Sequence, residues 1–275
     1  MSSDNKSSRL SITFIFGIVT ILLAGSLFMG TASAITNGQP DGDGHPAVCA
    51  VAVFDDTFAY IGFGSGTLIS PNVVLTAGHV TDLAYITVVY FGEDVMNSPE
   101  FMVLGAPHTY PGFFMSPSMA GGLFNFHGDV GVIVLDEAVP NSVVSPAEYG
   151  VLPDVGMVDT LTKKAQVDIV GYGFQEIITG EGSPYWDGFL TRYNGTCEFI
   201  RSNYVASDEF MKLSSNPSND KGGTSYGDSG GPILMHGTNT ILGITSFGPS
   251  YWCKSTWYAF RVDTDPVLNW INSFL

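Results

Sequence analysis

Residues 227–232 read Gly-Asp-Ser-Gly-Gly-Pro and contain the strongest candidate for chemistry in the chain. A serine hydroxyl is a weak nucleophile unless a nearby base takes its proton. Acyl transfer also needs backbone N–H groups aimed at the developing oxyanion, and glycines beside a serine let the backbone turn tightly to provide them. A Gly-rich turn between strands would explain the same residues without chemistry. The motif therefore predicts Ser229 as a nucleophile, provided that a base lies elsewhere in the chain.

The candidate base is His79, which ends the segment Thr76-Ala77-Gly78-His79 after a short apolar run. A strand that ends in small residues can present an imidazole at the rim of a barrel. Imidazole titrates near neutral pH, which suits a general base and acid. A lone histidine is more often a surface or core residue, so this assignment depends on the other motifs.

The candidate carboxylate is Asp129, which directly precedes the apolar residues 130–135. A carboxylate beside a catalytic imidazole accepts its N–H, fixes its tautomer and stabilises the imidazolium. An ordinary turn residue at the start of a strand is the competing interpretation. Asp136, at the other end of the same apolar run, is the rival position.

Together these motifs resemble those of the trypsin/chymotrypsin-like serine proteases. The order His79, Asp129, Ser229 is the order of that family, and separations of 50 and 100 residues are of the family's size. The resemblance covers nearly the whole chain after residue 34. Further similar segments are residues 66–70 before the histidine, 168–173 with Tyr172 for the usual Trp, 246–248 with Phe247 for Trp, and the C-terminal helix around Trp270.

The resemblance implies an all-β fold of two antiparallel six-stranded β-barrels with a C-terminal α-helix and the active site in the cleft between the barrels. The expected division is residues 35–155 for the first barrel and 156–275 for the second barrel with the helix. In such a site Ser229 attacks the carbonyl, His79 transfers the proton, and Asp129 orients His79. The N–H groups of Gly227 and Ser229 form the oxyanion hole. This chemistry needs no metal and no organic cofactor.

The family also activates itself by burying a new N-terminal ammonium against the Asp before the nucleophile, here Asp228. The matching N-terminus is Ile35-Thr36-Asn37-Gly38, which directly follows Ala34. We hypothesise that cleavage of a leader at Ala34 creates the activating terminus at Ile35.

Residues 1–34 have the pattern of a secretory signal peptide. Lys6 and Arg9 precede an apolar run over residues 10–29, and the segment ends in Ala-Ser-Ala. A retained membrane anchor is the alternative, because the run approaches the roughly 20 residues that a spanning helix needs. We expect cleavage, a secreted protein, and no stable membrane association afterwards.

The other elements that must position these residues are short strands. Apolar or alternating runs recur between clusters of Gly, Pro, Asn, Asp and Ser. The expected strands are residues 48–54, 59–63, 67–69, 73–77, 85–91, 130–135, 165–172, 232–235, 240–246 and 256–262. Residues 111–126 are expected to form a long loop. One helix is predicted at the C-terminus, with Asp265 as N-cap, Pro266 in the first helical position, and Val267, Trp270, Ile271 and Phe274 on one face.

Composition excludes several functions. Hydrophobic residues make up 45% of the chain, so it is not a disordered protein. The net charge of −16 argues against nucleic acid as a partner, because binding phosphates requires clustered Lys and Arg. Three cysteines allow at most one internal bridge, and Cys197 with Cys253 is the pairing that we favour. The partners expected are protein or peptide substrates, bound by a monomer.

The sequence departs from the family at several points. Val80 and Ser225 stand where the animal enzymes usually have cysteines. The base of the specificity pocket falls at Gly223, which supplies no carboxylate for Lys or Arg. With Thr224, Ser246, Phe247 and Gly248 as the other expected substrate-binding residues, the pocket is predicted to be neutral and to take apolar or aromatic side chains. Trp252 or Trp257 could narrow it.

Two alternatives to a secreted serine endopeptidase stay open. A catalytically inactive homologue could act as a binding or regulatory protein on the same fold, although such proteins usually lack a residue of the triad. A serine esterase of the α/β class would need the chain order Ser, Asp, His, and here the serine comes last.

Overall fold

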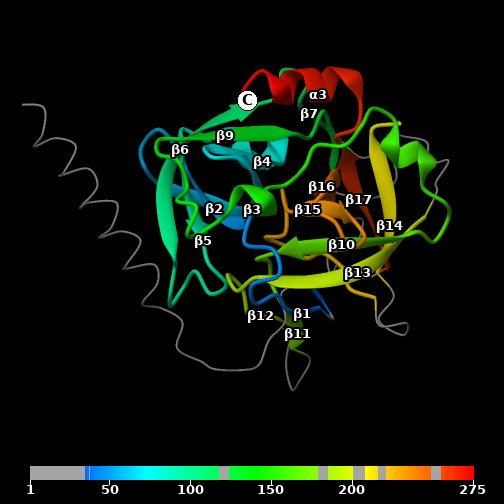
Figure 1. Ribbon diagram of the computed structural model, residues 1–275, viewed down its shortest axis with the longest axis horizontal. Helices are drawn as coiled ribbons and strands as arrows, with labels where there is room; N and C mark the ends of the chain where they lie inside the picture. Colours follow the sequence, from blue (N-terminus) through cyan, green and yellow to red (C-terminus); the bar gives the residue numbers. More distant parts are fainter. Residues whose placement is uncertain are drawn as a thin grey trace, which may run out of the picture. The chain divides into compact units, whose positions relative to one another are not determined.

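Antiparallel strands make up most of the regular secondary structure that is described after residue 34 (Figure 1). The computed structural model describes residues 35–36, 38–117, 124–178, 185–200, 208–215, 221–248 and 255–275. The predicted signal peptide, Asn37, Trp252 and Cys253 therefore lie outside the described residues. None of the helices in the described ranges is long and apolar enough to cross a membrane.

Six strands form a closed barrel in the order β2-β3-β4-β9-β6-β5. They are β2 (Val48–Phe54), β3 (Tyr60–Ser70), β4 (Val73–Thr76), β5 (Ile86–Phe91), β6 (Phe101–Thr109) and β9 (Gly131–Leu135). β-branched side chains fill the interior, as their preference for pleated surfaces favours. The filling is tight at Gly105 in β6, where a Cβ atom would lie 2.4 Å from Cγ2 of Ile133.

A seven-stranded sheet has the order β1-β13-β10-β15-β16-β17-β14, and an additional β13–β14 pairing closes six of its strands into a second barrel. Its strands are β1 (Gln39–Pro40), β10 (Gln166–Gly171), β13 (Tyr193–Phe199), β14 (Phe210–Ser215), β15 (Pro232–Met235), β16 (Ile241–Phe247) and β17 (Ser255–Arg261). The prediction of two antiparallel six-stranded barrels is confirmed.

The remaining elements are short. Two hairpins consist of β7 (Phe114–Pro117) with β8 (Phe124–His127), and β11 (Glu176–Ile178) with β12 (Tyr185–Asp187). Two 3₁₀ turns are η1 (Pro146–Glu148) and η2 (Met157–Thr160), and the short helix α2 is Gly78–Thr81. The β7–β8 hairpin corrects the prediction of a long loop over residues 111–126, because both ends of that segment pair with each other.

The predicted C-terminal helix is α3 (Asp265–Asn272). Its N-cap is Thr264, so Asp265 is the first helical residue and not the cap that the sequence suggested. Val267 and Ile271 are buried, and Trp270 packs edge-to-face on Tyr110 with ring centroids 5.3 Å apart. The helix that follows the second barrel therefore packs against the end of β6 in the first barrel.

Cys49 and Cys197 are free thiols, each wholly buried in a different core cluster. Burial raises the pKa of both thiols above the ordinary value. The favoured bridge between Cys197 and Cys253 is therefore not present at Cys197.

Candidate active site

The structure brings His79 and Asp129 together. β4 pairs antiparallel with β9, which sets the end of one strand beside the start of the other. α2 follows β4 and carries His79, and Asp129 lies just before β9. Nδ1 of His79 lies 2.9 Å from Oδ2 and 3.0 Å from Oδ1 of Asp129, whose Oδ1 also accepts the His79 backbone N–H at 2.8 Å. The rival Asp136 is exposed at the other end of β9.

Asp129 is wholly buried, and its environment keeps it ionised. Burial by itself would raise its pKa. The charge of His79 and the hydrogen bonds from His79 and Ser246 outweigh burial and hold the pKa below its usual value. The Ser246 hydroxyl, on β16 of the second barrel, donates to Oδ2 of Asp129. Ser246, predicted only as a substrate-binding residue, thus links the second barrel to this carboxylate.

Two glycines let the loop of Ser229 approach the first barrel. Gly227 and Gly230 have φ of +98° and +87°, in the left-handed region that favours glycine. A Cβ on Gly227 would lie 2.3 Å from the ring of Phe63, and one on Gly230 would lie 2.1 Å from Oγ1 of Thr76. The Ser229 carbonyl accepts the backbone N–H of Ser65 at 2.7 Å. The loop of Ser229 is therefore bound to the strands that lead to His79.

Val80 and Ser225, which stand where the animal enzymes usually have cysteines, make other contacts in this structure. A Cβ on Gly64 would lie 2.9 Å from Cγ2 of Val80, so the Val80 side chain occupies this space without a bridge. Ser225 contacts Asp228 instead: its backbone N–H donates to the carboxylate at 2.7 Å, and its hydroxyl lies 3.1 Å from the carboxylate and also against the carbonyl of Phe174. The N–H of Gly173 also donates to Asp228, at 2.8 Å.

Asp228 is wholly buried, and no cationic side chain pairs with it among the described residues. Burial outweighs its three hydrogen bonds and raises its pKa to about 7. Ile35 is also wholly buried, in the core cluster of the second barrel, and Thr36 pairs with Gly223. In the uncleaved chain the nitrogen of Ile35 is an uncharged amide. Within the described ranges, this buried carboxyl therefore has no cationic partner that would stabilise its charged form.

This raised pKa predicts a pH-dependent stability of the uncleaved chain. A carboxyl whose pKa is higher in the folded state favours folding at low pH, and this contribution is lost as the pH rises from about 4 to about 7. Over that window we expect the free energy of unfolding to fall by up to about 4 kcal/mol through Asp228. Urea unfolding of the uncleaved Ser229→Ala chain, with and without Asp228→Asn, measures this difference. Equal pH slopes in the two chains would contradict it.

Phe126, which the sequence placed at the end of a loop, stacks on the ring of His79. The ring centroids are 4.8 Å apart and the planes differ by 16°. Phe126 also meets Phe247 edge-to-face at 5.9 Å. No local pattern identifies this contact, because it depends on the β7–β8 hairpin. Aromatic side chains therefore border the imidazole on this side.

The predicted pocket residues differ in exposure. Gly223, Thr224 and Ser246 are buried, Phe247 is half-buried and Gly248 is exposed. Trp257 is 4% exposed and belongs to the core cluster of the second barrel. This Trp therefore packs in the core.

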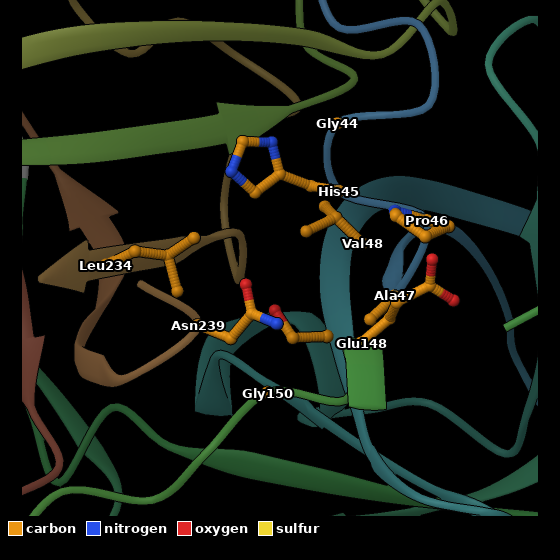
Figure 2. Close-up of a pocket in the computed structure, with 10 residues that line it drawn as sticks. Gly44, His45, Pro46, Ala47, Val48, Glu148, Gly150, Leu234 and Asn239 are labelled. Atoms are coloured by element: carbon orange, nitrogen blue, oxygen red, sulfur yellow. The ribbon is translucent and has the colours of Figure 1, made fainter. Parts of the chain in front are cut away.

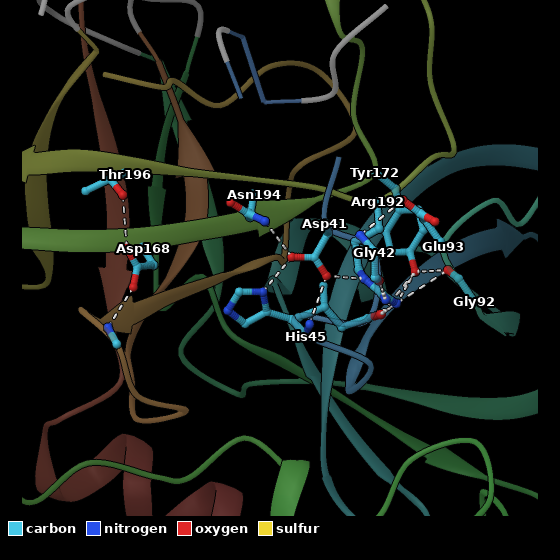
Figure 3. Close-up of polar contacts among 12 residues, drawn as sticks. Asp41, Gly42, His45, Gly92, Glu93, Asp168, Tyr172, Arg192, Asn194 and Thr196 are labelled. Atoms are coloured by element: carbon cyan, nitrogen blue, oxygen red, sulfur yellow. Dashed lines mark hydrogen bonds and ion pairs between the residues drawn. The ribbon is translucent and has the colours of Figure 1, made fainter. Parts of the chain in front are cut away.

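A buried ion pair anchors the segment that follows Ile35 to the second barrel (Figure 3). Nε of Arg192 donates to Asp41 at 2.7 Å, and Nη1 donates to the hydroxyl of Tyr172 at 3.2 Å. Burial would raise the pKa of Asp41, but His45, Arg192 and Asn194 lower it to about 2. Breaking one side of such a pair typically costs roughly 3–5 kcal/mol. The network holds β1 and its flanking residues in place.

Two cavities in the described part of the chain lie away from His79, Asp129 and Ser229. One of about 30 Å³ is lined by His45, Val48, Thr67 and Leu234 among others, and has room for about one water (Figure 2). A second of about 350 Å³ is lined by polar residues including Glu100 and Arg192. Neither is lined by His79, Asp129 or Ser229. Within the described ranges, no group of three His, Cys, Asp or Glu side chains is arranged to hold a metal ion.

Comparison with known proteins identifies the family. The family model described as Trypsin matches residues 44–271. Serine protease 1 and Serine protease 2 of Drosophila melanogaster are each 24% identical to this chain over 246 residues, covering 86% of this chain and 84% of the relative.

Solved structures share the fold at lower identity. A structure titled HL collagenase has a TM-score of 0.66 at 19% identity, covering 87% of this chain and 97% of that one. A structure titled GrC has a TM-score of 0.63 at 16% identity, covering 87% of this chain and 98% of that one. A structure of a mutant of human heparin binding protein has a TM-score of 0.61 at 15% identity, covering 87% of this chain and 96% of that one. Since the family model spans most of its length, the chain belongs to the trypsin family.

Proposed function

We propose that this protein is a secreted serine endopeptidase that hydrolyses peptide bonds through Ser229, His79 and Asp129. The observation that carries the proposal is the buried, ionised Asp129 held 2.9 Å from Nδ1 of His79. The docking of the Ser229 loop against β3 and β4 supports it, because these strands lead into the segment of His79. Secretion rests on the signal-like residues 1–34.

In this mechanism the Asp129 carboxylate accepts Nδ1–H of His79, so that Nε2 is free to act as the base. Oγ of Ser229 attacks the substrate carbonyl while Nε2 takes the serine proton. The oxyanion of the tetrahedral intermediate accepts hydrogen bonds from the N–H groups of Gly227 and Ser229. His79 then protonates the leaving amine, the C–N bond breaks, and the acyl group remains bound to Oγ of Ser229 as the acyl-enzyme. Water then attacks the acyl carbonyl while His79 takes its proton. As the acyl–Oγ bond breaks, His79 gives that proton to Oγ of Ser229, which releases the acid and restores the serine.

We propose cleavage of the leader after Ala34 as the activating step. The new ammonium of Ile35 would pair with Asp228, whose raised pKa reflects a buried carboxyl without a cation. N-terminal sequencing of the secreted protein tests this step. A secreted, active protein that begins elsewhere would contradict activation by signal cleavage alone.

The alternative is a catalytically inactive homologue that binds a partner. One structural neighbour is titled a heparin binding protein. Our chain carries a net charge of −16, which disfavours a polyanion of that kind. A fluorophosphonate probe separates the two functions, because it labels a serine only when its base activates it. We expect labelling of Ser229 in wild type and none in Ser229→Ala or His79→Ala. An unlabelled, folded and processed wild type would favour the inactive homologue.

Specificity follows from the neutral base of the pocket at Gly223. We expect cleavage after apolar or aromatic residues, because no carboxylate there offsets the desolvation of a Lys or Arg side chain. Gly223→Asp should shift the preference toward Lys and Arg. Ratios of kcat/KM for matched peptides with Phe or Arg before the cleaved bond measure both effects. A wild type that cleaves only after Lys and Arg would contradict the neutral pocket.

A further inference from the structure

Ser65 on β3 is a buried residue that contacts the nucleophile loop on both sides of Asp228. We propose that its hydroxyl is a positioning group for the oxyanion hole, an inference that rests on the proposed peptidase function. Ser65 is wholly buried, and 162 positions separate it from Gly227. No local sequence pattern marks this serine.

Four hydrogen bonds define its place. Oγ of Ser65 donates to the carbonyl of Gly227 at 2.9 Å and accepts the N–H of Tyr172 at 3.1 Å. Its backbone N–H donates to the carbonyl of Ser229 at 2.7 Å. Its own carbonyl accepts the hydroxyl of Thr76 at 2.7 Å. One residue of the first barrel thus holds carbonyls on either side of Asp228 and joins them to the end of β10.

These contacts fix the directions of the two oxyanion donors. The carbonyl of Gly227 belongs to the peptide unit between Gly227 and Asp228. The N–H groups of Gly227 and Ser229 belong to the peptide units directly before and after it. Gly227 has φ of +98°. A glycine backbone can rotate widely about φ and ψ when no contact restrains it. By holding that carbonyl, the Ser65 hydroxyl restricts rotation of the peptide between Gly227 and Asp228. An oxyanion hole depends on donors that are already aligned before charge develops.

Tyr172 extends the same restraint into the second barrel. Its N–H donates to Ser65, while its ring is wholly buried and its hydroxyl donates to the carbonyl of Gly92 at 2.5 Å. The residue after it, Gly173, donates its N–H to Asp228. The Ser65 hydroxyl therefore lies between the nucleophile loop, at Gly227, and the segment Tyr172-Gly173, which also holds that loop.

The chain offers a matched control two residues along the same strand. Thr67 is also a buried hydroxyl residue of β3 and points to the same face of the strand as Ser65. Its Oγ1 has no hydrogen-bond partner within the described part of the chain. Thr67→Val therefore removes a buried hydroxyl of this strand that does not contact the loop, whereas Ser65→Ala removes the one that does.

The experiment compares wild type, Ser65→Ala, Ser65→Cys and Thr67→Val, each expressed as the full chain and processed in the same way. We expect Ser65→Ala to lower kcat by about 10–100-fold with KM changed less than about threefold, because the lost alignment matters only when charge develops. The inhibition constant of a peptide aldehyde, whose adduct places an oxyanion in the hole, should rise by a similar factor. Ser65→Cys, whose thiol is a weaker donor than a hydroxyl, should have a kcat and an inhibition constant between those of wild type and Ser65→Ala. Thr67→Val should keep kcat within about twofold.

Thermal unfolding of every variant separates a positioning role from a purely structural one. The inference is overturned if Ser65→Ala lowers the Tm but keeps wild-type kcat and aldehyde affinity, or if Thr67→Val loses as much kcat. If Ser65→Ala does not fold, Ser65→Cys alone decides, with a selective loss of kcat supporting the inference and wild-type kcat overturning it. A processed wild type without any turnover would instead refute the proposed function and this inference with it.

Discussion

Ser229→Ala is expected to abolish peptide hydrolysis, with a fall in kcat on the order of 10⁶-fold. The reason is that the hydroxyl of Ser229 is the only group in the proposed mechanism that forms the acyl-enzyme. Without it, the oxyanion hole and substrate binding retain only about 10³–10⁴-fold acceleration over the reaction in water. Steady-state turnover of a fluorogenic peptide, with active-site titration of wild type, measures the loss.

Ser142→Ala is the matched control, since Ser142 is an exposed serine outside the proposed site. We expect it to retain wild-type kcat and KM. The Tm of Ser229→Ala should stay close to that of wild type, because Ser229 makes its described contact with Ser65 through its backbone. A folded Ser229→Ala protein that kept more than about a thousandth of the activity would contradict Ser229 as the nucleophile.

Asp129→Asn is expected to lower kcat by about 10⁴-fold while leaving the fold intact. Asn has the shape of Asp, but its amide donates where the carboxylate accepts, so His79 would present Nδ1 as an acceptor and carry its proton on Nε2. The imidazole could then no longer take the serine proton. The amide oxygen can still accept the backbone N–H of His79 in the place of Oδ1, and the Ser246 hydroxyl, which now donates to Oδ2, can turn to accept from the amide NH2. The pH profile of kcat/KM measures whether any residual activity returns as the pH rises.

Asp136→Asn provides the comparison, because it makes the same change at the other end of β9, where the side chain is exposed. We expect its kcat to stay within about twofold of wild type, in line with surface substitutions elsewhere. Equal losses in the two variants would mean that Asp129 acts through general charge and not through its contact with His79.

Local patterns predicted the strands best where one buried run stands between clear turn residues. The bounds of β2 and β15 match the prediction, and β9 and β10 differ by one residue or two at their ends. The proximity of His79 and Asp129 was implied by the resemblance to the protease family, because either residue by itself could equally be an ordinary residue beside a strand. The motif around Ser229 was informative because its glycines are needed for a conformation that few other residues adopt.

The parts that the sequence did not reveal depend on distant contacts. β6 contains Gly105 and Pro107, two residues that usually weaken a strand, yet Pro107 pairs with Ile133 in a closed barrel. Ser65 and Arg192 carry no local signal, since the partners that define their roles, Gly227 for Ser65 and Asp41 for Arg192, lie more than a hundred residues away. Phe126 reaches His79 only through a hairpin whose middle residues have no strand pattern. Such residues are recognised from the three-dimensional arrangement alone.

The most direct test of the central claim is cleavage of a mixed peptide library, with products identified by mass spectrometry. It compares the processed wild type with Ser229→Ala prepared in parallel. We predict cuts that appear only with wild type, mostly after apolar or aromatic residues. A folded wild type that begins at Ile35 and makes no cuts would contradict a peptidase and favour a binding protein on the trypsin fold.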